Sequence, residues 1–166
     1  MNIFKLDNCP KLSAKLQHDK HIVKMVLESA QLLCSAYATD SNPPYKRTHY
    51  NHPCSIWVRT SRDNYEWLID HAMALSHEYT RRYGRVHKSQ AVIERCTDHI
   101  DLIEFTDSGF TDLPMAMPHK YKTDDVTTAY QNYYINEKLN AKTSWTRTSV
   151  PKIFQNKMEL IHREGI

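Results

Sequence analysis

The sequence predicts an all-α fold, formed as a single compact helical domain with long ordered loops over residues 1–166. Apolar residues recur at helical spacing in several segments, whereas the apolar–polar alternation typical of strands is scarce. Hydrophobic residues make up 40% of the chain and there are only 3 Gly and 7 Pro, which excludes collagen-like, linker-like and disordered compositions. A length of 166 residues suits one domain with its own core.

The first helix is expected over residues 19–37. Its apolar residues gather on one side of a helical wheel: Ile22, Val23, Val26, Leu27, Ala30, Leu33, Cys34 and Tyr37. Asp19 is a suitable N-cap, because its short side chain can accept a hydrogen bond from the first turn. Pro43 and Pro44 cannot continue a helix, so a loop follows.

Three further helices and one long loop are predicted. One helix starts near Ser61 and ends at Gly84, since glycine suits the left-handed residue that follows a helix. A shorter helix spans residues 89–96, and the last one spans residues 124–139, where acidic residues suit the positive end of the dipole. Residues 106–121 are rich in Gly, Pro, Asp and Met without a period, so they are expected to form an ordered loop.

Several function classes lack their usual signs. The chain has no run of about 18 apolar residues and its start has no signal-peptide features, so a cytoplasmic protein without membrane spans is expected. The four cysteines are irregularly spaced without a C-x-x-C pair, which favours reduced thiols over a zinc ribbon. Phosphate-loop, dinucleotide, zincin and hydrolase-elbow motifs are absent, so no cofactor is expected.

Basic residues gather in two parts of a chain whose formal net charge is only +3. Residues 81–88 form one basic run, and between Lys138 and Arg163 six basic residues stand against a single acid, Glu159. Such patches suit a polyanion such as nucleic acid. The alternative is that both are solvated faces, and that the arginines near Gly84 simply complement the negative end of a helix dipole.

The polar face of the first helix carries a group of reactive side chains. At about 100° per residue, the face opposite the apolar stripe holds His21, Lys24, Glu28, Gln31 and Ser35. Lys24 and Glu28 are four residues apart, and on spacing alone they form a surface salt bridge worth a few tenths of a kcal/mol. In a cleft, a carboxylate flanked by Lys and His could instead orient or deprotonate a water, or stabilise a developing cation.

Three stretches of the chain together point to a known family. The run Asp19-Lys20-His21-Ile22-Val23 is followed by Glu28, the loop contains Tyr50-Asn51-His52-Pro53, and the C-terminal part contains Tyr130-Gln131-Asn132-Tyr133-Tyr134 with Lys138. In order, they resemble the first-helix signature, a stretch of bacterial relatives and the C-terminal aromatic-basic segment of the pyrimidine dimer DNA glycosylase family. This is the phage endonuclease V type of repair enzyme.

The resemblance implies a small all-α enzyme that binds duplex DNA and flips a nucleotide out of the stack. Such an enzyme breaks the glycosidic bond of a damaged or modified pyrimidine and cleaves the abasic strand by β-elimination, through a Schiff base at C1′. Glu28 would stabilise the cationic sugar and move protons, and His21 would help to hold the site and the DNA. The family's phosphate-binding arginines correspond here to Leu27 and Gln31, so another base or nucleotide substrate fits as well.

The nucleophile of this reaction stays open between three groups. In the family it is the terminal amine of a chain that has lost its initiator Met to expose a small residue, whereas the bulk of Asn2 normally leaves Met1 in place. The candidates are therefore the α-amine of Met1, the side chain of Lys24 one helical turn from Glu28, and a water activated by Glu28.

The expected partner is DNA, contacted from three regions. They are the loop ahead of Pro53, the end and exit of the helix before Gly84, and the C-terminal aromatic-basic segment. The predicted contacts are Lys46, Arg47, His49, Asn51, His52, Arg82, Lys88, Tyr130, Tyr134 and Lys138. The loop histidines also allow a metal-dependent nuclease, although the plain alternative is a histidine that buttresses the loop through a backbone hydrogen bond.

Two other functions remain open. One is a non-catalytic small helical protein that binds nucleic acid or a protein partner, and the other is a nucleotide-level hydrolase. Burial separates the catalytic from the non-catalytic interpretation. A catalytic Glu28 should line a cleft with His21, Lys24 and one of the other clusters, whereas a plain surface glutamate should face open water.

Overall fold

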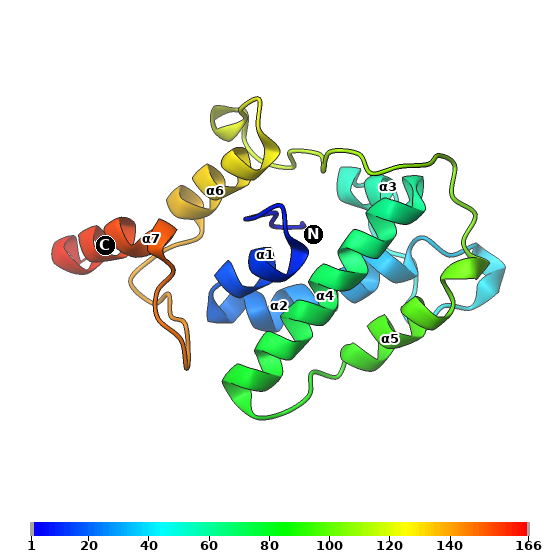
Figure 1. Ribbon diagram of the computed structural model, residues 1–166, viewed down its shortest axis with the longest axis horizontal. Coiled ribbons are helices and arrows are strands. Elements are labelled where there is room, and N and C mark those ends of the chain that lie inside the picture. Colours follow the sequence, from blue (N-terminus) through cyan, green and yellow to red (C-terminus); the bar gives the residue numbers. More distant parts are fainter. Residues whose placement is uncertain (1, 166) are drawn as a thin grey trace.

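The computed structural model describes residues 2–165, and within that range it contains helices and no β-strand, so the all-α prediction is confirmed. The α-helices are α1 Pro10–Leu16, α2 Asp19–Cys34, α3 Pro53–Thr60, α4 Arg62–Tyr83, α5 Gln90–Asp98, α6 Val126–Glu137 and α7 Lys152–Glu164 (Figure 1). Short 3-10 turns lie at η1 Thr39–Ser41, η2 Ile100–Leu102 and η3 His119–Tyr121.

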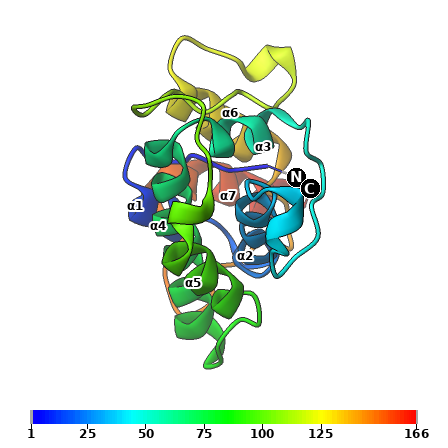
Figure 2. The same cartoon turned by 90° about the vertical axis from the view of Figure 1, so that its right-hand side faces the viewer.

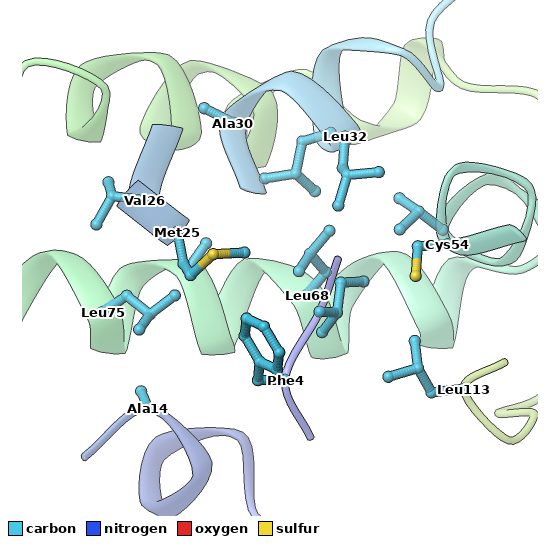
Figure 3. Close-up of a cluster of buried hydrophobic side chains, with 14 of the residues drawn as sticks. Phe4, Ala14, Met25, Val26, Ala30, Leu32, Cys54, Leu68, Leu75 and Leu113 are labelled. Atoms are coloured by element: carbon cyan, nitrogen blue, oxygen red, sulfur yellow. The ribbon is translucent and has the colours of Figure 1, made fainter. Parts of the chain in front are cut away.

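Helix α4 is the centre of the packing, because it contacts α1, α2, α3 and α5. Its fully buried apolar stripe consists of Tyr65, Leu68, Ala72 and Leu75. These residues recur every three or four positions, so one face of the helix stays inside the molecule. Figure 3 shows side chains of α2 and α1, together with Phe4 from the chain start, gathered around α4 in this core.

The long predicted helix ahead of Gly84 is confirmed together with both of its ends. Ser61 Oγ accepts a hydrogen bond from the backbone N–H of Asn64 at 3.2 Å, which satisfies one free donor of the first turn of α4. Gly84 has a φ of 69°, a left-handed conformation that closes the helix and that residues with a Cβ rarely adopt.

Helix α2 differs from its prediction at both ends. Its N-cap is His18, and the predicted cap Asp19 is instead the first residue of the helix. The helix ends at Cys34 rather than at Tyr37. The Asp19 carboxylate is taken up by Arg82 at 3.0 Å and by the hydroxyls of Ser144 and Thr146 at 2.9 and 2.8 Å. These long-range partners explain why the carboxylate does not cap its own helix.

The other predicted segments also form, with small shifts in their boundaries. Helix α5 follows Ser89, and α6 is capped by Asp125, whose side chain accepts from the backbone N–H of Thr128 at 2.6 Å. Residues 106–121 are a loop apart from η3, and Leu113 anchors this loop in the core with 1% exposure. The loop crosses the molecule from the α5 end to α6, as Figures 1 and 2 show from two sides.

Helices α1, α3 and α7 were not predicted. Both α1 and α3 open on a proline, Pro10 and Pro53, which fits the first turn because its N–H would have no partner there. Helix α7 buries Phe154, Met158 and Ile161 on one face, while most of its other residues are charged or polar and Ile153 and Leu160 are exposed. It lies beside α6 at the end of the molecule opposite α5 (Figure 1).

The predicted DNA contact by Arg82 is wrong, because its side chain is 0% exposed. The guanidinium lies 3.0 Å from Asp19 and 3.2 Å from Glu78, and it donates to the backbone carbonyl of Gln17 at 2.9 Å. Burial alone would raise the pKa of Asp19, but hydrogen bonds from Thr146, Ser144 and Arg82 outweigh it and lower that pKa. Arg82 therefore joins the end of α4 to the start of α2 from inside the protein.

Candidate active site

A cleft of about 270 Å³ opens beside the polar face of α2. It is bounded by the chain start, α2, the loop ahead of α6 and the end of α6. Its lining residues are Asn2, Phe4, His21, Lys24, Met25, Glu28, Ala116, Tyr133 and Lys138. The helical spacing thus brings His21, Lys24 and Glu28 to one cleft. Lys138, from the C-terminal aromatic-basic segment, lines the same cleft.

Glu28 is the carboxylate of this cleft, and only 13% of its side chain is exposed. One oxygen lies 3.2 Å from Lys24 Nζ, and the other accepts a hydrogen bond from the backbone N–H of Asn2 at 3.2 Å. Lys24 itself is 67% exposed, so its ammonium lies at the mouth of the cleft. Each oxygen of the Glu28 carboxylate therefore has one partner, Lys24 Nζ or the Asn2 N–H. The carboxylate can meet a ligand in the cleft between these two groups.

His21 enters the site as a neutral, tightly packed ring. Its imidazole stacks on Phe4 with 4.5 Å between ring centroids and on His18 with 4.1 Å. Burial lowers the pKa of His21 to about 2, and the ammonium groups of Lys138 and Lys24, together with His18 when it is protonated, act in the same direction. Its buried Nδ1 has no hydrogen-bond partner among residues 2–165. The ring can therefore shape the cleft and accept or donate one hydrogen bond, but it cannot act as an imidazolium acid near neutral pH.

Lys138 supplies the second positive charge of the cleft. Its Nζ lies 4.7 Å from the Tyr133 ring centroid and 6.0 Å from that of Phe4, so aromatic faces hold the ammonium at the end of α6. Lys24 of α2 and Lys138 at the end of α6 thus bring two ammonium groups to the cleft that holds the Glu28 carboxylate. This arrangement can hold a phosphate next to a group that stabilises positive charge.

The predicted DNA contacts of Tyr130 and Tyr134 are wrong, since both side chains are fully buried. The Tyr130 hydroxyl donates to the carbonyl of Pro114 at 2.7 Å, and the Tyr134 hydroxyl accepts from the backbone N–H of His18 at 3.0 Å. Both tyrosines belong to the apolar stripe of α6. Their neighbour Tyr133 is the residue of that segment that reaches the cleft.

The loop ahead of α3 lies outside the cleft. Lys46, Arg47, His49 and Asn51 are exposed there, and Arg47 donates to the backbone carbonyl of Tyr37 at 2.6 Å. His52 caps α3, because its Nδ1 accepts from the backbone N–H of Cys54 at 3.2 Å. The plain interpretation of a loop histidine thus describes His52 in this structure.

Lys88 is exposed after α4, and Met1 lies outside the described residues. Within residues 2–165 no group of three or more His, Cys, Asp or Glu side chains is arranged to hold a metal ion. No helix in that same part of the chain is long and apolar enough to span a membrane.

Asn2, Phe4, Ala116 and Tyr133 line the cleft without having been predicted as site residues. Asn2 and Glu28 are 26 residues apart, and Asn2 and Ala116 are 114 apart, so no helical spacing relates them. Tyr133 lies inside a segment that the sequence did single out. Its neighbours Tyr130 and Tyr134 drew attention instead, because all of them fit the same aromatic pattern.

Comparison with protein families gives a match. The family model described as pyrimidine dimer DNA glycosylase matches residues 1–91, which include the Glu28 face of α2 and the whole of α4. Comparison with curated proteins and with solved structures gives no match.

Proposed function

The chain belongs to the pyrimidine dimer DNA glycosylase family, and on that premise we propose that it is a DNA N-glycosylase with abasic-site lyase activity. It removes a damaged or modified pyrimidine from duplex DNA. The observation that carries this proposal is the position of Glu28, whose carboxylate lines a cleft between the Lys24 ammonium and the Asn2 N–H. A glutamate that only decorated a helix surface would be more exposed than 13%.

The chemistry needs a group that stabilises positive charge at the sugar. As the bond between C1′ and the pyrimidine nitrogen breaks, the base leaves with the bonding electrons and is protonated, while positive charge develops at C1′ and O4′. The Glu28 carboxylate is placed to stabilise that charge and to accept the proton of the attacking nucleophile. Lys24 and Lys138, which both line the cleft, are proposed to hold the flanking phosphates.

The lyase step needs an amine nucleophile. Its attack forms a C1′–N bond, and opening of the C1′–O4′ bond with protonation of O4′ gives a Schiff base. Loss of a C2′ proton then expels the 3′ phosphate. The candidate amines are Met1 and Lys24, and Lys24 Nζ lies 3.2 Å from Glu28. If water attacks instead, base release proceeds without a Schiff base.

Outside the cleft, the exposed residues Lys46, Arg47, His49, Asn51 and Lys88 are proposed to contact the duplex backbone. They lie on the loop after α2 and on the exit of α4, both C-terminal to α2 in the sequence. Contacts of this kind set affinity and register and do not select the base.

The test is incubation with duplexes that carry a cyclobutane thymine dimer, uracil or an abasic site, with and without borohydride. Wild type is expected to release a base and nick the strand, and borohydride is expected to trap a covalent adduct whose peptide map identifies the amine. Glu28→Gln is expected to lose base release at least 100-fold, within the range typical of a general acid–base group.

The matched control is Glu66→Gln. Glu66 also forms an i,i+4 pair, with Arg62 at 2.8 Å on the exposed face of α4, so it loses the same charge without touching the cleft. It is expected to keep wild-type rates. Base release without trapping would assign a water-using enzyme, whereas binding of all three duplexes without any change would favour the non-catalytic alternative.

A further inference from the structure

We propose that Asn2 is a positioning residue of the active site, whose side-chain amide fixes the start of the chain against Glu28. The inference rests on the proposed function and adds residues that neither the sequence patterns nor the family match assign. Its starting point is the hydrogen bond of 3.2 Å from the Asn2 backbone N–H to Glu28. That bond forms only while the first residues of the chain stay at the floor of the cleft.

The Asn2 side chain is held by hydrogen bonds on both of its ends. Its Nδ2 donates to the backbone carbonyl of Ala116 at 3.0 Å. Its Oδ1 accepts from the backbone N–H of Ile3 at 2.8 Å and faces the Tyr130 hydroxyl at 3.1 Å. The amide group therefore connects the chain start to the 106–121 loop and to α6.

A thiol completes the surroundings of this oxygen. Cys54 of α3 lies with its Sγ 3.7 Å from Asn2 Oδ1. Burial raises the pKa of Cys54 to about 11, so the group remains a thiol near neutral pH and donates to Oδ1, which has no proton of its own. The Asn2 oxygen thus lies among three donors that come from the chain start, α3 and α6.

The far side of the anchor is itself fixed. The Tyr130 hydroxyl shares its single proton between the Pro114 carbonyl at 2.7 Å and Asn2 Oδ1 at 3.1 Å, and it accepts from the backbone N–H of Ala116 at 3.3 Å. Tyr130 is fully buried, so this hydroxyl is a rigid reference point. Tyr130, which is buried and not a DNA contact, therefore holds Asn2 in place beside Glu28.

Only asparagine meets all of these demands at position 2. Aspartate has no donor for the Ala116 carbonyl and would place a second carboxylate near Glu28. Leucine has nearly the same size and makes no hydrogen bond. Both keep a bulky second residue, so they leave the state of Met1 unchanged, whereas a small residue would expose a new terminal amine and confuse the result.

The experiment compares Asn2→Leu, Asn2→Asp and Tyr130→Phe with wild type, after intact mass measurement has verified the same N-terminus in each. Single-turnover rates of base release and of borohydride trapping are expected to fall about tenfold or more. The duplex Kd is expected to stay within about twofold for Asn2→Leu and Tyr130→Phe, since neither variant changes the charge of the cleft. The matched control Tyr65→Phe removes another fully buried hydroxyl, bonded to the carbonyl of Leu33 at 3.3 Å, and is expected to keep the wild-type rate.

A second readout does not depend on activity. Hydrogen exchange of the Asn2 backbone N–H, measured by NMR, is expected to be at least tenfold faster in Tyr130→Phe than in wild type or Tyr65→Phe. Unchanged rates and unchanged exchange in Asn2→Asp and Tyr130→Phe would overturn the inference and leave the proposed function standing. A wild type inactive on every duplex would overturn the proposed function and the catalytic part of the inference together, while the exchange data would still show whether the anchor exists.

Discussion

At the residue scale, the cleft combines the Glu28 carboxylate with one neutral imidazole and two ammonium groups. Lys24 and Lys138 carry charge toward a ligand, while His21 carries none, because burial between Phe4 and His18 disfavours the imidazolium. The histidine that drew attention beside Glu28 is thus part of the wall of the site. Charge stabilisation is left to the carboxylate.

His21 is therefore expected to stay neutral well below the pH at which free histidine titrates. With a pKa of about 2, its ring NMR signals should not shift between pH 8 and pH 5. A histidine free in water changes charge near pH 6.5 and would shift fully over this range. Titration of His21 with a midpoint near 6 would contradict the packing described here.

Lys138 is expected to contribute one phosphate contact. Lys138→Gln should weaken duplex binding several-fold at low salt and reduce the slope of log Kd against log salt by about 1. Lys11→Gln, which removes an exposed lysine of α1 that lines no part of the cleft, should leave that slope unchanged. Equal slopes for wild type and Lys138→Gln would remove Lys138 from the DNA interface.

At the element scale, the helices that the sequence predicts are those with a complete local signal. Helix α4 has a capping serine, a long apolar stripe and a terminal glycine. Helices α1 and α3 have 7 and 8 residues, too few for a period to stand out. Helix α7 was not predicted, because the basic residues of this segment indicated an interaction surface. Its buried residues Phe154, Met158 and Ile161 nevertheless have helical spacing.

The buried ion pairs of Arg82 connect two of these elements, and their loss is expected to destabilise the fold. Arg82→Leu leaves Asp19 without its cation inside the protein and leaves Glu78 paired with Arg81 alone, which should cost about 3–5 kcal/mol of unfolding free energy. Urea unfolding measures this loss.

Arg62→Leu is the control for that measurement, because Arg62 forms ion pairs with Glu66 and Asp101 in open solvent. It should lose much less stability. Duplex affinity of the folded Arg82→Leu protein should equal that of wild type. A selective loss of affinity with unchanged stability would restore the DNA contact that the sequence suggested.

At the scale of the whole molecule, one half of the candidate site follows from the sequence and the other half from the fold. The helical period places His21, Lys24 and Glu28 on one face, and this is visible in a single segment. Asn2 and Ala116 join them only because the loop ahead of α6 crosses the molecule. Contacts over such sequence separations depend on the complete packing of the chain and leave no local pattern.

The whole fold is also expected to weaken in mild acid, because His18, His21 and His71 are buried as neutral rings. Burial lowers the pKa of His18 and of His71 to about 4. Below about pH 6.5 these histidines are therefore protonated in the unfolded chain while they stay neutral in the folded protein. Their contribution to stability is complete above pH 6.5 and falls as the pH falls toward 4.

At pH 5.5 each of these histidines should cost about 1.4 kcal/mol of unfolding free energy relative to neutral pH, so about 4 kcal/mol in all. Urea unfolding at pH 7.5 and pH 5.5 gives this difference directly. His71→Gln should reduce the difference by about one third, because it removes one of the three histidines. His71 is chosen because, unlike His21 and its stacking partner His18, it lies away from the cleft. A stability that rises from pH 7.5 to 5.5 would have the wrong sign.

The central claim, that Glu28 performs the glycosidic chemistry, is tested most directly by single-turnover base release from one duplex that wild type acts on. The rate is compared between wild type, Glu28→Gln and Glu28→Asp at equal duplex saturation. The account predicts a loss of at least 100-fold for Glu28→Gln and a smaller loss for Glu28→Asp, which keeps the charge but withdraws it by one methylene. Base release at the wild-type rate by Glu28→Gln would contradict it.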